Sequence, residues 1–155
     1  MSGRQVEETV NPKLALAFGA DVLIVLGFAA AGRSTHDSGG SVAGTLTTAA
    51  PFLLGLVVGW AAILLIRRRP PTVDAGTSSG ISSPTSLVAG ITIWATTLIF
   101  GLGLRVLLGG TAALPFILVA MAVLGAGLIG WRLVALVVRR LRTHRSATEP
   151  PIRAK

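Results

Sequence analysis

Four long apolar stretches constrain this chain more than any other feature of its sequence. They cover residues 14–31, 42–66, 87–108 and 111–138, and each holds at most one charged side chain. A helix needs roughly 20 apolar residues to cross about 30 Å of hydrocarbon, because each residue rises about 1.5 Å. The sequence therefore predicts an all-α fold, an integral membrane bundle of four transmembrane helices.

The composition also suits a lipid environment. Hydrophobic residues make up 52% of the 155 residues and charged residues only 13%, and the mean hydropathy is +0.75. The absence of cysteine excludes disulfides, thiolate metal sites and cysteine nucleophiles. A net charge of +8 would suggest nucleic acid binding in a soluble protein. Here the basic residues stand at the ends of apolar runs, so we expect no nucleic acid partner.

The polar segments divide the chain into two helical hairpins. We predict a tail at 1–13, a first hairpin at 14–66, a flexible linker rich in Pro, Gly, Ser and Thr at 67–86, a second hairpin at 87–138, and a basic tail at 139–155. An alternative interpretation makes residues 1–31 a cleaved signal peptide. The charge of Asp21 in the middle of the apolar run argues against it.

With four spans, both tails and the linker share one side of the membrane. That side would hold eleven basic residues, and the other side Arg33 and Arg105. The positive-inside rule then places both termini in the cytoplasm, and the Arg-, Ala- and Gly-rich composition is typical of a bacterial source, so we predict a multi-pass protein of the bacterial cytoplasmic membrane. Anionic lipid head groups would be attracted to this basic face. Its members are Arg4, Lys13, Arg67, Arg68, Arg69, Arg139, Arg140, Arg142, Arg145, Arg153 and Lys155.

One phrase of the sequence occurs twice. Residues 48–60 read TAAPFLLGLVVGW and residues 111–131 read TAALPFILVAMAVLGAGLIGW. This recurrence supports the hypothesis of an internal duplication of the hairpin. The alternative is coincidence, because Pro in a first turn and Trp near a boundary are common in transmembrane helices.

Charged and Trp residues are predicted to share one level of the bundle. Counted from the cytoplasmic ends, Asp21, Arg132 and three Trp residues lie roughly 10–12 Å deep. Arg33 and Arg105 lie roughly 17 Å further, toward the outer surface. The Trp residues of this layer are Trp60, Trp94 and Trp131.

Asp21 and Arg132 are natural partners, because they carry opposite charges at the same depth on the first and last helices. An isolated charge there costs about 2.5–3.5 kcal/mol, so a contact would stabilise both. The alternative has Arg132 reaching the surface with its long stem and Asp21 protonated.

Small residues at helical spacing predict close helix packing. The third helix has such a face, the second offers a GxxxG, and the fourth offers three small residues four apart. These residues are Gly90, Trp94, Thr97, Gly101 and Arg105 on the third helix, Gly55 and Gly59 on the second, and Ala122, Ala126 and Gly130 on the fourth.

The sequence contains no recognisable catalytic, phosphate-binding or metal-binding motif. We therefore expect no catalytic residue, cofactor or metal. His36 stands beside Asp37, where it could titrate near neutral pH, although a solvated loop histidine is the alternative interpretation.

Three segments carry a resemblance to a known family. ADVLIVLGFAAAGRSTH, TAAPFLLGLVVGW and GGTAALPFILVAMAVLGAGLIGWR resemble the uncharacterised membrane protein family known as domain of unknown function 3054. The resemblance covers roughly residues 14–140. It implies a four-helix membrane protein of bacteria or archaea and no assigned activity.

Three classes of function remain. The first is a non-enzymatic assembly or interaction protein whose partner is a second copy or another membrane protein. The second is a small transporter or an ion or proton pathway using Asp21, Arg132 and the hydroxyls of Thr96 and Thr97. The third is an intramembrane enzyme, for which no nucleophile or metal set is recognisable.

Overall fold

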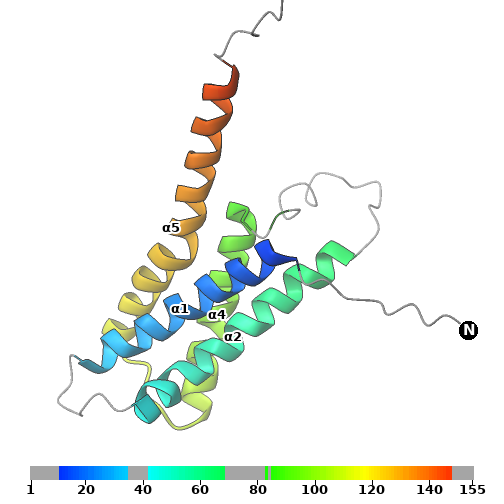
Figure 1. The fold of residues 1–155 in the computed structure, drawn as a ribbon. Coiled ribbons are helices and arrows are strands. Elements are labelled where there is room, and N and C mark those ends of the chain that lie inside the picture. Colours follow the sequence, from blue (N-terminus) through cyan, green and yellow to red (C-terminus); the bar gives the residue numbers. More distant parts are fainter. Residues whose placement is uncertain (1–10, 35–41, 69–82, 84, 148–155) are drawn as a thin grey trace, which may run out of the picture.

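The described part of the chain is a bundle of four long helices. The computed structural model describes residues 11–34, 42–68, 83 and 85–147. The helices are α1 (Pro12–Ser34), α2 (Val42–Arg68), α4 (Leu87–Leu107) and α5 (Leu114–Ala147), as Figure 1 shows. Each is long and apolar enough to cross a membrane. The prediction of an all-α fold with four helices of membrane-spanning length is thus confirmed.

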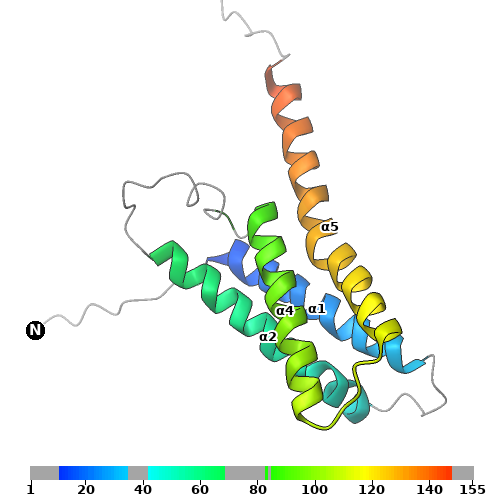
Figure 2. The same ribbon diagram turned by 180° about the vertical axis from the view of Figure 1, so that it is seen from behind.

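The helices form a ring in which each packs mainly against two others. In chain order α1 contacts α2, α2 contacts α4, α4 contacts α5, and α5 returns to α1. The starts of α1 and α4 and the ends of α2 and α5 lie together, at what we call the terminal end (Figures 1 and 2). The opposite end is called the far end. In both views α5 runs obliquely to α1 and leans away from the bundle toward the terminal end.

Helix α5 is longer than the sequence pattern predicts. The apolar stretch ends at residue 138, but the helix continues to Ala147. Residues 139–147 contain neither Pro nor Gly, and Arg, Leu and Ala are good helix formers. The segment predicted as the start of a basic tail is therefore a helical extension that projects beyond the other three helices (Figure 1).

The most extensive contact joins α2 to α4 and therefore links the two predicted hairpins. A Cβ placed on Gly55 would lie 2.9 Å from the backbone oxygen of Thr97, and one on Gly59 would lie 3.1 Å from the Cα of Ile93. Gly101 of α4 receives the ring of Phe52 from α2. The predicted packing role of Gly55, Gly59 and Gly101 is confirmed, because side chains there would push the helices apart.

The predicted packing stripe on α5 is wrong. A Cβ on Gly130 would meet no atom within 4 Å, and Ala122 and Ala126 are exposed. The bundle instead contacts Ala120, Leu124, Leu128 and Arg132, which are all fully buried. Residues two positions apart differ by about 200° around a helix, so the small residues lie on the opposite face.

Local signals fix both ends of α4. Ser86 caps the start, since its hydroxyl accepts a hydrogen bond of 3.1 Å from the backbone N–H of Ala89. At the other end Gly109 has φ +82, and the N–H of Gly110 donates to the carbonyl of Arg105 over 2.9 Å. A side chain at Gly109 would be strained there. This turn leads to α5, which begins at Leu114.

Candidate functional site

Asp21 of α1 and Arg132 of α5 form a buried bidentate ion pair. The two guanidinium nitrogens donate to the two carboxylate oxygens: Nη1 to Oδ1 over 2.8 Å and Nη2 to Oδ2 over 2.7 Å. Both side chains are 0% exposed. Of the two alternatives that the sequence leaves open, the structure has the pair, and Arg132 does not reach for the surface.

Two Trp side chains complete the shell of Asp21. The indole Nε1 of Trp60 on α2 donates to Oδ2, and that of Trp131 on α5 donates to Oδ1, both over 2.9 Å. Each carboxylate oxygen thus accepts two hydrogen bonds, which matches the roughly four lone-pair positions of an ionised carboxylate. We call Asp21, Trp60, Trp131 and Arg132 the Asp21 clamp.

Arg132 is held in position by its own helix and by α4. Its Nη1 also donates to the backbone oxygen of Leu128 over 2.6 Å, and its guanidinium carbon lies 4.5 Å from the centre of the Trp131 ring. A Cβ on Gly90 would lie 2.7 Å from the Cδ of Arg132, so the stem of the arginine crosses α4 at a residue without a side chain. The clamp therefore unites all four helices.

Trp94 does not belong to this layer. Its indole donates to the backbone oxygen of Met121 over 3.2 Å, and its ring lies against Gly125. Counting from Ser86 places Trp94 at the depth of Arg132, but Gly90 already occupies that level. Trp94 therefore lies about one turn, roughly 6 Å, farther toward the far end.

The repeated phrase has a spatial counterpart. Its two Gly-Trp motifs contribute Trp60 and Trp131, which both bind Asp21. Its two Pro-Phe motifs contribute Phe52 and Phe116, whose ring centres lie 5.4 and 6.0 Å from that of Phe28. Asp21 and Phe28 are both on α1. The two copies thus contact one helix at the same two levels.

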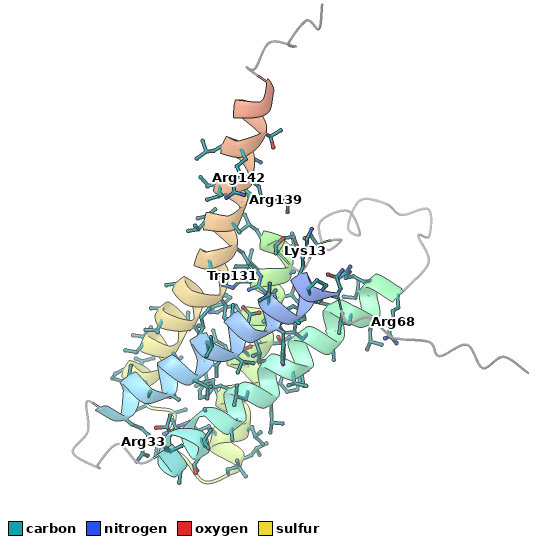
Figure 3. The ribbon with its side chains drawn as sticks, viewed as in Figure 1. Lys13, Arg33, Arg68, Trp131, Arg139 and Arg142 are labelled. Atoms are coloured by element: carbon teal, nitrogen blue, oxygen red, sulfur yellow. The ribbon has the colours of Figure 1, made fainter. Side chains whose placement is uncertain are left out.

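Arg33 and Arg105 lie apart from the clamp, at the far end. Both line a pocket of about 580 Å³, and Figure 3 shows Arg33 at the end opposite Lys13 and Arg139. The Nε of Arg105 donates to the backbone oxygen of Thr111 over 3.0 Å, and its guanidinium lies 4.7 Å from the centre of the Phe116 ring. Arg33 lies against Gly44 of α2. His36 is outside the described residues.

Sequence reasoning identified the ion pair but missed the indole donors and the role of Gly90. The predicted common depth of Trp60, Trp131 and Asp21 was the signal that could have suggested the indole bonds. Nothing in the sequence marked Gly90 as the crossing point of an arginine stem. In the described part of the chain, no three His, Asp or Glu side chains are grouped as metal ligands would be.

The comparison with family models decides which family this chain belongs to. Residues 18–135 match the model described as "Protein of unknown function (DUF3054)". The chain belongs to this family. The resemblance stated from the sequence is confirmed, and every residue of the clamp in this DUF3054 member lies inside the matched range. Neither the curated proteins nor the solved structures contain a match.

We expect Asp21→Asn and Arg132→Gln each to lower the free energy of unfolding by about 3–5 kcal/mol, because each leaves a buried partner unsatisfied. The double variant should lose about 1–3 kcal/mol less than the sum of the single losses. Denaturant titration of purified protein in mixed micelles measures all four forms. Strict additivity would contradict an energetic coupling between the two side chains.

The Trp residues offer a matched comparison. Trp60→Phe removes a donor to a charged acceptor and should cost about 1.5–3 kcal/mol beyond the effect of the smaller ring. Trp94→Phe makes the same chemical change but removes a donor to a backbone oxygen at an exposed site, so it should cost about 1 kcal/mol. If both variants lose the same free energy of unfolding in this assay, the hydrogen bond from Trp60 to Asp21 contributes no more than the bond from Trp94 to a backbone oxygen.

Proposed function

We propose that this DUF3054 member crosses the bacterial cytoplasmic membrane four times, with both termini in the cytoplasm. Large apolar side chains on all four helices face outward: Leu16 is 74% exposed, Leu54 55%, Ile99 70% and Val134 62%. Such a surface is costly in water and favourable in lipid.

The charges support this orientation. Among the described residues, six basic side chains lie at the terminal end, and Arg33 and Arg105 at the far end. Basic residues accumulate on the cytoplasmic side of bacterial membrane proteins. The six are Lys13, Arg67, Arg68, Arg139, Arg140 and Arg142.

The role that the site supports best is non-enzymatic membrane assembly or interaction. The observation that carries this proposal is the saturated carboxylate of Asp21, which accepts four hydrogen bonds and is 0% exposed. A group that binds a proton, an ion or a substrate must exchange its partners during each cycle. Asp21 instead uses all its acceptor positions to join α1 to α2 and α5, as expected of a scaffold whose partner is a second copy or another membrane protein.

One observation favours the transporter or proton pathway as a second candidate. A pocket of about 570 Å³ opens at the terminal end and is lined by Trp131, whose indole bonds to Asp21. A single ring thus lies between this pocket and the carboxylate. The hydroxyl of Thr96 adds little to this candidate, because it donates to backbone oxygens of its own helix. The buried hydroxyl of Thr97 has no hydrogen-bond partner among the described residues.

Orientation can be tested with single cysteines, because the chain has none of its own. Thr111 and Arg68 are both exposed, at the far end and the terminal end. In intact spheroplasts, a membrane-impermeant maleimide should label Thr111→Cys at once and Arg68→Cys only after permeabilisation. The reverse pattern, or immediate labelling of both variants, would contradict the proposed orientation.

The function can be tested by two measurements on the same protein. We expect the chain in gently solubilised membranes to migrate as a complex heavier than the monomer, since a scaffold has a partner. A proton-sensitive dye trapped in proteoliposomes should record the same proton leak as in empty vesicles, because Asp21 is fully buried.

Asp21→Asn separates the two candidates in that assay. A wild-type proton flux that this variant abolishes would establish the pathway in place of the scaffold. A chain that migrates only as a monomer in extracts of its own membrane would remove the assembly role.

A further inference from the structure

A basic pocket lies at the terminal end, between α1, α2 and α5. It measures about 570 Å³, and its charged lining consists of Lys13 from α1, Arg67 from α2 and Arg139 from α5. The hydroxyl residues Ser83 and Thr85, just before α4, also line it. Figure 3 shows Lys13 and Arg139 at the terminal end with Trp131 below them. We call this site the terminal pocket.

The positive charge of the terminal pocket is not compensated by the described part of the chain. Asp21 is the one carboxylate among the described residues, and it binds Arg132. Three cations from three helices therefore converge with no described acid between them. Like charges that converge on a concave surface raise its potential and favour an anion there. The hydroxyls of Ser83 and Thr85 lie 2.8 Å apart and share one hydrogen bond, so one hydroxyl proton of the two can still be donated to a phosphate oxygen.

The rest of the lining is apolar, which points to an amphipathic anion. Leu14, Leu16, Ala17 and Ala135 share the pocket with the cations, and Leu16 is 74% exposed on the outer face of α1. Lys13 lies eight residues from Asp21, about 12 Å along the helix, where a head group would lie if the clamp is inside the membrane. A free phosphate would make no use of the leucines, whereas acyl chains would follow them outward.

We propose that the terminal pocket binds the phosphate head group of an anionic phospholipid. The proposal rests on the proposed insertion in a membrane. Lys13, Arg67 and Arg139 contact the phosphate, and the acyl chains lie along the apolar surface of α1 and α5. Because Trp131 lines the pocket and bonds to Asp21, the bound lipid supports the clamp from the terminal end. Lipid binding should therefore appear as added stability of the folded bundle.

The test compares phosphatidylglycerol with phosphatidylcholine of the same acyl chains, each added to the full chain in uncharged detergent micelles. Phosphatidylglycerol should raise the melting temperature of the wild-type protein by several degrees, and phosphatidylcholine should not. Native mass spectrometry should show retained phosphatidylglycerol. Lys13→Gln with Arg139→Gln should weaken the apparent affinity for phosphatidylglycerol about 30-fold, since each of the two basic residues contributes about 1 kcal/mol to such binding.

The matched control is Arg68→Gln with Arg142→Gln. It removes the same charge at the same end of the protein, from exposed residues outside the terminal pocket. We expect this control variant to keep most of the rise in melting temperature that phosphatidylglycerol produces in the wild-type protein. If both double variants lose the same part of the lipid-induced shift in melting temperature, the lipid is attracted by the basic surface in general. That result would overturn the proposed site.

Two further outcomes would also overturn the proposal. One is a wild-type melting temperature that phosphatidylglycerol leaves unchanged. The other is an equal shift produced by sodium phosphate at the same concentration, which would identify a site for free phosphate. These outcomes leave the proposed scaffold role intact, because that role is judged by the mass of the membrane complex and by proton flux.

Discussion

The bond between Asp21 and Arg132 is the interaction on which the rest of the structure depends. Burying an acid and a base is costly, and the cost is offset only when the geometry is good and every remaining donor and acceptor is satisfied. Here the second condition requires an indole from α2, an indole from α5 and a backbone oxygen of α5. Gly90 of α4 makes room for the arginine stem. The ion pair between the first and last helices thus fixes the position of the two helices between them.

Around this centre the structure uses two kinds of contact. Where α2 meets α4, glycines let the backbones approach each other, and dispersion forces between closely fitted surfaces hold the pair. Where α5 meets α1, Ile24 packs against Gly127, and the ion pair of Asp21 and Arg132 joins the two helices. The Phe28, Phe52 and Phe116 rings pack together at the far end. The α2–α4 contact is thus close backbone packing, whereas α1 and α5 are also joined by polar bonds.

The sequence predicted what depends on length, charge and spacing within one helix. Four apolar runs located four helices, and opposite charges at equal depth paired Asp21 with Arg132. The errors arose where one helix face had to be chosen or a depth counted. Once Arg132 faces Asp21, Leu128 lies on the same face four positions away, and Gly130, about 200° around the helix from Arg132, faces outward. The depth of Trp94 was misjudged because Ser86 was taken as a membrane boundary, whereas it is only the cap of α4.

The placement of the acid in the first helix and its base in the last has a consequence for how the protein is made. Asp21 and Arg132 are separated by 111 positions in the chain. In a chain inserted in a membrane as we propose, Asp21 leaves the ribosome long before Arg132, so α1 would enter the lipid before the partner of its acid is made. Synthesis of α5 is thus also the step that supplies the partner of Asp21 on α1.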